Sequence, residues 1–367
     1  MRLGALQMHK VLSLSSCLLL TLLMCATLPR ADEQNPARPV ADAAVNADTP
    51  ARQVRYSHLK IESTIGDVIA HPAFAGFGRL ILPWDDPNPD VNLRLSDISG
   101  LLPYHGDVNP AEIVAALNRM IDDANGGKTL FYDFYTEAQK KADPIKRNTG
   151  LFFFRGKPGA PFAIVCPGGG FSYVASLHEG FPYAAEISKS GYNALVLKYR
   201  AGLGGGAATQ DLAAAISYVF KNAKTLGVGV SDYSLWGSSA GARMAASIGS
   251  HGTAFYGGDA LPRPSVVVMA YTGHSEVTLD EPPTFAVVGE QDGIATPNVM
   301  ERRISVLRRA GTPVEFHKFQ NVGHGFGLGT GTSAEGWTGN AIRFWQQFNG
   351  GPTRTSVHKM PDRPETK

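Results

Sequence analysis

The stretch YSLWGSSAGARMAASI (residues 233–248) decides the fold, because a strand, a tight turn and a helix follow one another within it. YSLW is an apolar run typical of a strand, and ARMAASI has a helical pattern. Between them, Gly237, Ser239 and Gly241 form the pattern G-x-S-x-G. Glycines two residues before and after a serine permit a sharp turn that holds the hydroxyl clear of the sheet. Ser239 is therefore a candidate nucleophile, and the alternative is that it only caps the helix.

The chain around this turn alternates between short apolar runs and helical patterns. The apolar runs predict strands at 151–154, 162–166, 194–198, 233–236, 265–270, 284–288 and 314–319. The helical patterns predict helices at 181–190, 209–226, 240–250, 297–310 and 334–348. Such alternation predicts an α/β fold over residues 151–350, a mostly parallel sheet with helices on both faces. Chemistry is then expected at the carboxyl ends of the strands.

A second glycine-rich turn, PGGGF (167–171), directly follows the predicted strand FAIVC. Consecutive glycines let a loop direct two N–H groups at one point, where each could stabilise a developing oxyanion by about 3 kcal/mol. A phosphate cradle is a weaker explanation, because the chain has no G-x-x-x-x-G-K-[ST] pattern, and a flexible turn is the simplest alternative. We expect Gly169, Gly170 and Ala240 to form an oxyanion hole.

A base and an acid for the serine follow later in the chain. Asp292 lies in the loop GEQDG after one predicted strand, and His324 lies between glycines in NVGHGF after the next. A neutral imidazole can remove the serine proton near pH 7, and a carboxylate can orient the ring and stabilise its protonated form. Glu290 and Asp280 are rival acids, whereas His317, inside a predicted strand, is expected to be structural.

Three further residues of this segment are candidates for substrate binding. They are Phe171, which ends the glycine loop, His178, which lies in a predicted loop, and Trp337, which follows the glycines after the candidate base. Trp337 could equally be a core residue.

Residues 56–150 precede the alternation and mix proline-rich loops with helices predicted at 109–125 and 134–141. This segment could add a strand to the sheet edge or cover the site as a cap, and the sequence leaves both open. Its Trp84, Tyr104 and His105 are conceivable pocket residues, although surface or core positions are favoured.

The two ends of the chain predict targeting and connecting segments. Residues 1–31 have a basic start and an apolar run, the layout of a secretory signal peptide. A membrane anchor, or a lipid anchor at Cys17, is the minor alternative. Residues 32–55 predict a linker and residues 351–367 a polar tail. We therefore expect export to the periplasm or the medium, without stable membrane insertion.

The composition excludes several function classes. The 367 residues are 43% hydrophobic and 18% charged, as in globular proteins. The net charge is +2 and belongs to the predicted signal, so the rest of the chain is close to neutral and nucleic acid is a poor candidate partner. Cys166 is the only cysteine beyond that signal, which excludes an internal disulfide there. Because no H-E-x-x-H pattern or metal-ligand spacing occurs, we expect neither a metal nor another cofactor.

These motifs resemble the α/β-hydrolase superfamily and, within it, the feruloyl and acetyl-xylan esterase-like (BD-FAE-like) branch. The resemblance covers residues 150–350 and rests on PGGGF, HEGFPYAAEISKSGYNALVLKYR (178–200), DLAAAISYVFKNAKTLGV (211–228), SLWGSSAGARMAA (234–246), TFAVVGEQDGIATP (284–297) and VEFHKFQNVGHGFGLG (314–329). It implies a triad of Ser239, Asp292 and His324. Pro167 stands where many lipase-like relatives have histidine, which points to small esters associated with carbohydrate.

The leading expectation is therefore a serine carboxylesterase that hydrolyses acetyl-like esters, with carbohydrate esters among the candidate substrates, through an acyl-enzyme. The alternatives are a secreted peptidase of the prolyl-oligopeptidase type and a non-catalytic binding module that keeps the fold. The sequence does not predict the oligomeric state.

Overall fold

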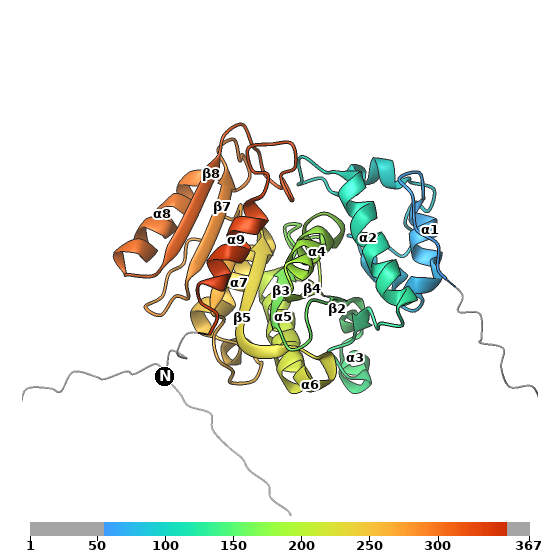
Figure 1. Cartoon of the computed structure of the whole chain (residues 1–367), viewed down its shortest axis with the longest axis horizontal. Helices are drawn as coiled ribbons and strands as arrows, with labels where there is room; N and C mark the ends of the chain where they lie inside the picture. The colour runs from blue at the N-terminus through green and yellow to red at the C-terminus, as the bar shows by residue number, and fades with distance from the viewer. Residues whose placement is uncertain (1–54, 351–367) are drawn as a thin grey trace, which may run out of the picture. The chain divides into compact units, whose positions relative to one another are not determined.

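The computed structural model describes residues 55–350 (Figure 1). The predicted signal peptide, the predicted linker up to residue 54, and the predicted polar tail lie outside these residues. The strands are β1 Phe131–Tyr132, β2 Gly150–Phe154, β3 Pro161–Cys166, β4 Asn193–Lys198, β5 Gly229–Ser238, β6 Val266–Ala270, β7 Thr284–Gly289 and β8 Val314–Phe319. The helices are α1 Ile65–Ala70, α2 Pro110–Asn125, α3 Glu137–Ala142, α4 Phe181–Lys189, α5 Gly204–Lys221, α6 Ala223–Leu226, α7 Ala240–His251, α8 Pro297–Arg309 and α9 Trp337–Gln346.

The strands form one sheet in the order β1-β2-β4-β3-β5-β6-β7-β8. From β4 to β8 all neighbours are parallel, and β2 is antiparallel to both β1 and β4. The predicted fold class, a mostly parallel sheet with helices, is confirmed. β2, β3, β4, β6 and β7 are buried along nearly their whole length, which explains why they read as continuous apolar runs rather than as alternating ones.

The direction of each crossover places the helices on the two faces. The chain moves one way across the sheet from β3 to β4 and the other way from β4 to β5, β5 to β6 and β7 to β8. Because such crossovers are right-handed, α4 covers one face and α5, α7 and α8 cover the other. α9 packs against α4, and α5 packs against α7, as this assignment requires (Figure 1).

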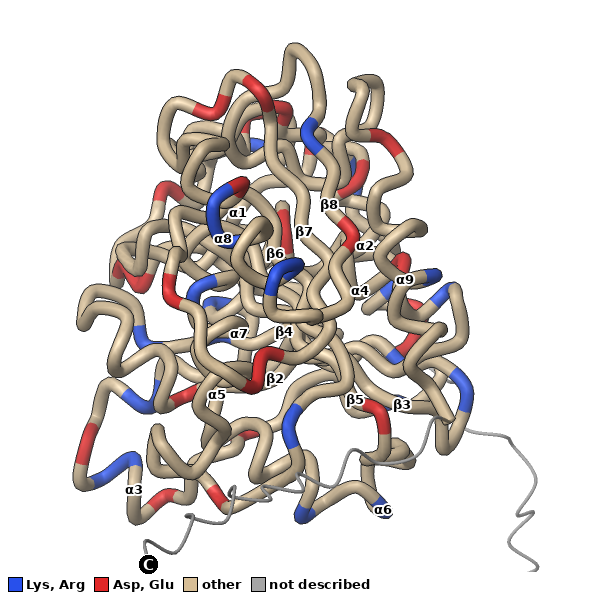
Figure 2. Tube along the Cα trace, turned by 90° about the vertical axis from the view of Figure 1, so that its left-hand side faces the viewer, with Lys and Arg blue, Asp and Glu red and all other residues tan. Residues whose placement is uncertain are grey.

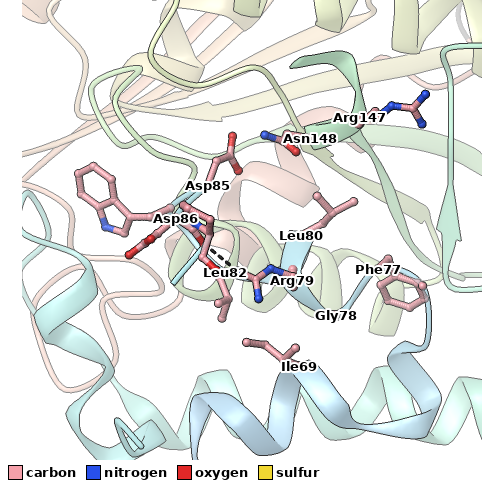
Figure 3. A pocket seen from close by; sticks show the side chains of 13 residues that line it. Ile69, Phe77, Gly78, Arg79, Leu80, Leu82, Asp85, Asp86, Arg147 and Asn148 are labelled. Atoms are coloured by element: carbon pink, nitrogen blue, oxygen red, sulfur yellow. Dashed lines mark hydrogen bonds between the residues drawn. The ribbon is translucent and has the colours of Figure 1, made fainter. Parts of the chain in front are cut away.

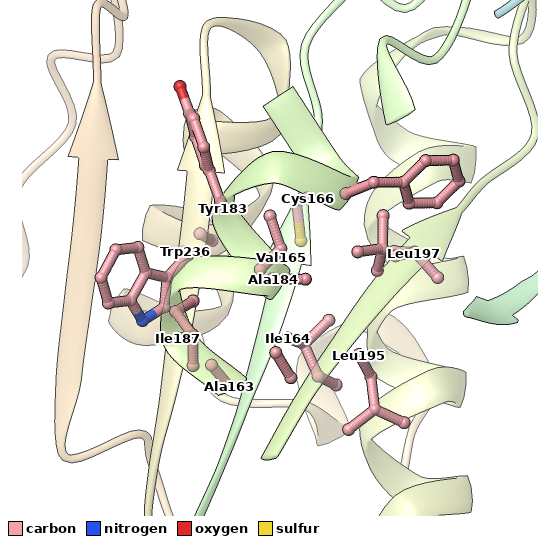
Figure 4. Close-up of a cluster of buried hydrophobic side chains, with 14 of the residues drawn as sticks. Ala163, Ile164, Val165, Cys166, Tyr183, Ala184, Ile187, Leu195, Leu197 and Trp236 are labelled. Atoms are coloured by element: carbon pink, nitrogen blue, oxygen red, sulfur yellow. The ribbon is translucent and has the colours of Figure 1, made fainter. Parts of the chain in front are cut away.

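The core lies where α4 packs on the central strands (Figure 4). Successive residues of β3 point to opposite faces of the sheet, so Ile164 and Val165 contribute to different layers. On the α4 side, Tyr183, Ala184 and Ile187 are spaced to share one face of the helix and are fully or almost fully buried.

Two predicted helices differ from the observed ones. The helix predicted at 209–226 is divided into α5 and α6 at Asn222, whose side-chain amide donates to the carbonyl of Tyr218. α5 also starts earlier than predicted, at Gly204, because packing outweighs the low helix propensity of glycine. The helix predicted at 334–348 is shorter and starts at Trp337.

Residues 56–150, called here the extension, add a strand to the sheet and also pack beside it. β1 pairs with β2 at the sheet edge, and α2 lies against α4 (Figure 1). α2 begins where Asn109 accepts a hydrogen bond from the N–H of Ala111, with Pro110 in the first turn, close to the predicted start. α1, which the sequence analysis did not predict, starts with a capping box between Thr64 and Asp67.

Charged residues of both signs are interspersed along the chain (Figure 2). This distribution agrees with a net charge close to zero for the chain beyond the predicted signal peptide. Within residues 55–350, no helix combines the length and the apolar character that a membrane span needs.

Candidate active site

Ser239 lies at the turn between β5 and α7, in a conformation that few residues adopt. Its φ is 49° and its ψ is −115°, outside the regions that are open to most side chains. The flanking glycines are required by close packing: a Cβ on Gly241 would overlap the carbonyl of Cys166, and one on Gly237 would overlap the backbone of Gly241. The Ser239 side chain makes no hydrogen bond to the N–H groups that open the described α7, so the helix-capping alternative is not supported.

The hydroxyl of Ser239 faces His324 instead. His324 Nε2 lies 3.0 Å from Ser239 Oγ, and His324 Nδ1 lies 2.8 Å from Asp292 Oδ2. The other oxygen of Asp292 accepts hydrogen bonds from the N–H groups of Ile294 and Ala295, at 2.9 and 2.7 Å. Asp292 and His324 are buried and Ser239 is half-buried, so the three side chains form a sheltered chain that ends at a reachable hydroxyl.

The rival residues lie elsewhere. Glu290 and Asp280 are exposed. His317 lies in β8, where its Nε2 is 2.7 Å from Glu315 Oε1. The structure therefore brings together the three residues predicted as a triad and none of their rivals.

The glycine loop after β3 faces this chain. Gly169 has a φ of 118° and Gly170 a φ of 62°, both in the region that favours glycine. Within residues 55–350, the N–H groups of Gly169, Gly170 and Ala240 have no hydrogen-bond partner. Three free N–H groups beside a serine could donate hydrogen bonds to a negatively charged oxygen. The N–H of Gly168 is already used, because it donates to Glu179 Oε2 at 2.5 Å.

Glu179 is a fully buried carboxylate that the sequence analysis did not select. Its Oε1 accepts a hydrogen bond from the hydroxyl of Tyr271 at 2.8 Å and lies 2.9 Å from His105 Nε2. Burial alone would raise the pKa of Glu179, but the charge of His105 and the hydrogen bonds outweigh it and lower the pKa to about 2. A signal was present in the sequence: Glu179 is the single acid in the otherwise apolar stretch YVASLHEGFPYAA (173–185).

Two of the three predicted substrate-binding residues are buried. His178 is 1% exposed, and its ring donates a hydrogen bond from Nε2 to the carbonyl of Gly325 at 2.9 Å. Burial, together with the charge of His105, lowers the pKa of His178 to about 4. Trp337 is also 1% exposed, and its indole N–H donates to the carbonyl of Gly327. Both side chains hold carbonyls of the loop after His324, and a role of either in substrate binding stays a prediction.

Phe171, the third of these residues, is half-buried and has a φ of 61°. A Cβ on Gly205 would lie 3.1 Å from its ring, so the ring packs against the start of α5. The ring remains partly exposed beside the glycine loop.

The extension reaches the glycine loop through an aromatic group. Tyr104 is 42% exposed, and its ring would lie 3.0 Å from a Cβ on Gly170. Trp84 is 37% exposed and lies 4.6 Å from the Tyr173 ring between centroids, and Tyr104 stacks on the same ring at 5.6 Å. Tyr104 thus borders the candidate oxyanion hole.

A separate cavity of about 630 Å³ lies in the extension (Figure 3). It is lined by Phe77, Arg79, Asp85 and Asn148, among others, and none of its lining residues belongs to the serine site. Within the described chain, no group of three His, Cys, Asp or Glu side chains could hold a metal ion.

Comparisons with known proteins concern the fold and part of the sequence. Residues 155–260 match the model of the BD-FAE family. The acetyl ester-xyloside bifunctional hydrolase from Caldicellulosiruptor lactoaceticus is similar at a TM-score of 0.52 and 21% identity, over 59% of this chain and 95% of that one. No curated protein matches the sequence.

Two further solved structures have lower scores. The α/β-hydrolase MGS-M1 from a Medee basin deep-sea metagenome library has a TM-score of 0.49 and 23% identity, over 55% of this chain and 92% of that one. The carboxylesterase Cest-2923 from Lactobacillus plantarum has a TM-score of 0.48 and 20% identity, over 54% and 92%. The chain has the α/β-hydrolase fold, and its resemblance to the BD-FAE branch is confirmed over residues 155–260.

Proposed function

We propose that the protein is a serine carboxylesterase that hydrolyses acetyl-like, short acyl esters through an acyl-enzyme. The observation that carries this proposal is the hydrogen-bonded chain from Ser239 through His324 to Asp292, with contacts of 3.0 and 2.8 Å. A hydroxyl, an imidazole and a buried carboxylate in this order are the parts that acyl transfer at a serine needs.

In the first half of the reaction, Ser239 Oγ attacks the ester carbonyl carbon while its proton passes to His324 Nε2. The imidazolium that forms is stabilised by Asp292, which has a fixed orientation because two N–H groups hold its other oxygen. When the tetrahedral intermediate collapses, His324 returns the proton to the departing alcohol oxygen, and the acyl group remains on Ser239. Water then repeats the sequence and releases the carboxylic acid.

The negative charge of the tetrahedral oxygen would be received by the N–H groups of Gly169, Gly170 and Ala240. They are free for this role within the described residues, whereas the N–H of Gly168 is engaged by Glu179. Each donor in such a site is worth about 3 kcal/mol of transition-state stabilisation.

The substrate class rests on resemblance and on the surroundings of the loop. The similar protein from Caldicellulosiruptor lactoaceticus is an acetyl ester-xyloside bifunctional hydrolase. We propose acetyl and other short acyl esters, including those on carbohydrate, as substrates. The partly exposed Phe171 and Tyr104, which flank the glycine loop, offer apolar surface for the ester.

The test is hydrolysis of p-nitrophenyl acetate by the wild-type protein and by Ser239→Ala. We expect the substitution to remove activity by a factor of about 10⁴ or more. Equal rates for the two proteins would rule out the proposal. A peptide that is cleaved faster than any ester would favour the peptidase alternative, and no labelling of Ser239 by a fluorophosphonate would favour a binding module. An acyl-chain series beside acetylated xylan would define the substrate.

We also propose that the protein is exported, as its first 31 residues predict. Fractionation of the source cells and sequencing of the mature N-terminus test this. Full-length protein in the cytoplasm would contradict it.

A further inference from the structure

The segment Tyr104–Gly106 of the extension touches both loops of the serine site. The N–H of Gly106 donates to the carbonyl of His324 at 3.0 Å. Gly325 lies so close to this segment that a Cβ on it would be 2.7 Å from His105 Cα. The main chain that carries the candidate base is therefore supported directly by a part of the protein outside residues 151–350.

The side chain of His105 reaches the other loop through Glu179. His105 is 1% exposed at its side chain, and Glu179 is fully buried. Nε2 of the His105 ring lies 2.9 Å from Glu179 Oε1, within ion-pair distance of the buried carboxylate. The other ring nitrogen lies 2.9 Å from the Tyr173 hydroxyl, which fixes the orientation of the ring.

Glu179 lies directly beside the nucleophile. The position that a Cβ would take on Gly168 is 2.9 Å from both Glu179 Oε2 and Ser239 Cβ. The same carboxylate accepts hydrogen bonds from the N–H of Gly168 and the hydroxyl of Tyr271, and its third polar neighbour is the ring of His105. A buried carboxylate needs such polar partners, and the loss of one leaves it undersatisfied and free to pull the glycine loop out of position.

We propose that His105 and Gly106 are positioning residues for the serine site: His105 completes the polar partners of Glu179 and so fixes the glycine loop, and Gly106 fixes the main chain of His324. This inference rests on the proposed esterase function and deepens it. The extension is then part of the catalytic apparatus rather than only a strand added to the sheet edge.

The first experiment compares His105→Leu with His105→Gln. Leucine removes the ring nitrogens and keeps most of the volume, while the glutamine amide can again place a polar group beside Glu179. We expect His105→Leu to lower kcat for p-nitrophenyl acetate about 10- to 100-fold, because displaced reacting groups cost about this much. KM should change less than about 3-fold, since no direct substrate contact is lost. His105→Gln should recover kcat to within about 5-fold of wild type.

The matched control is His71→Leu. His71 is another buried histidine of the extension, bonded to the carbonyl of Ser57 and the N–H of Ala73, without contact with the site. It should lose stability and keep kcat within about 2-fold of wild type. If His71→Leu lowers kcat as much as His105→Leu, or if a folded His105→Leu keeps wild-type kcat, the positioning role of His105 is overturned.

A second pair of variants tests the positioning role of Gly106, and it keeps the inference testable if His105→Leu does not fold. In Gly106→Ala the new Cβ would lie 3.2 Å from the carbonyl oxygen of His324, a tight contact that shifts the base by a few tenths of an ångström. In Gly100→Ala the Cβ meets nothing within 4 Å. We expect Gly106→Ala to lower kcat about 3- to 10-fold and Gly100→Ala to leave it unchanged. Equal kcat values for the two would refute the inference for Gly106.

Failure of the inference differs from failure of the proposed function. Wild-type protein without Ser239-dependent esterase activity would remove the function itself, and the positioning role with it. An active wild type with unaffected His105→Leu and Gly106→Ala variants would remove only the inference.

Discussion

The extension and the hydrolase core of residues 150–350 are built by different means. The core consists of buried strands and amphipathic helices, whereas the extension, apart from α2, consists of short helices and turns that are fixed by caps and by contacts with the core. Apolar side chains of both regions nevertheless belong to one continuous hydrophobic cluster. Periodic patterns are therefore enough to place Ser239, Asp292 and His324 on the sheet, while the alignment of the surrounding loops depends on the irregular segments of the extension.

Polar contacts join the two regions at the sheet edge. Arg200, directly after β4, donates to Asp211 of the core and to Asp143 of the extension, at 2.9 and 2.8 Å. The hydroxyl of Tyr135 in the extension donates to the same Asp211 at 2.6 Å, in a buried position. Such bonds require the two regions to fold against each other, and the predictions below test that dependence.

The largest loss of stability and activity is expected from a substitution at Gly241, where the core has no space for a side chain. Gly241→Ala would drive a Cβ into the carbonyl of Cys166, so the turn that carries Ser239 would have to move. We expect a loss of about 3 kcal/mol or more in the free energy of unfolding and a fall of at least about 100-fold in kcat/KM. Urea unfolding and p-nitrophenyl acetate assays measure the two. Gly100→Ala in the extension is the control, and equal tolerance of both substitutions would show that the turn is not held as tightly as described.

The next effect concerns the junction between the regions. Lys198 at the end of β4 is fully buried and donates to the carbonyls of Leu82 and Pro83 at 2.9 and 3.2 Å, and it pairs with Asp85 at 3.1 Å. Lys198→Met would leave the carbonyl of Leu82 and the carboxylate of Asp85 without this donor, whereas the carbonyl of Pro83 would keep the N–H of Val174. We expect a loss of about 3 kcal/mol in unfolding free energy and faster proteolysis near residues 82–87.

Asp85→Asn is the comparison for this prediction. The Asp85 side chain is 23% exposed and the two carbonyl bonds remain, so its cost should be clearly smaller. If Asp85→Asn costs as much as Lys198→Met, the ion pair rather than the carbonyl contacts holds the extension.

The limits of sequence reasoning follow the same division. The strands at 162–166, 194–198 and 284–288 match the observed elements to within one residue, because a buried parallel strand has a local signature in its own residues. That Ser239, Asp292 and His324 lie together was also predictable, since they follow three strands in a known order. The contact of His105 with Glu179 has no local signature, because it joins residues far apart in the chain whose burial only tertiary packing determines. The two-residue strand β1 gave no signal for the same reason.

The core should also set the response to acid. Burial, assisted by the charge of Arg303, lowers the pKa of His274 to about 4, and burial with the charge of His105 does the same for His178. In an unfolded chain a histidine has a pKa of about 6.5. Between these pH values the two histidines bind protons in the unfolded chain but not in the folded one. Their contribution to the free energy of unfolding is therefore fully present above pH 6.5 and is lost as the pH falls toward 4.

The measurement is the urea midpoint at several pH values. Each histidine contributes a slope of up to about 1.4 kcal/mol per pH unit, so His274→Gln should lose about 1 kcal/mol less than wild type between pH 6 and pH 5. Identical slopes for the variant and the wild type would mean that His274 is not kept neutral by the fold.

The smallest effect compares how two helices begin. In the extension, Thr64 accepts a hydrogen bond from the N–H of Asp67 and caps α1, whereas in the core Ser239 directs its hydroxyl to His324 and leaves α7 without a side-chain cap. Thr64→Ala should cost about 0.5 to 1 kcal/mol of stability and leave kcat unchanged, because only a cap is lost. Ser239→Ala should do the reverse, with stability retained and activity abolished. If Ser239→Ala destabilises the protein as a lost cap would, the hydroxyl supports α7 after all, and its contact with His324 is then only one of two roles.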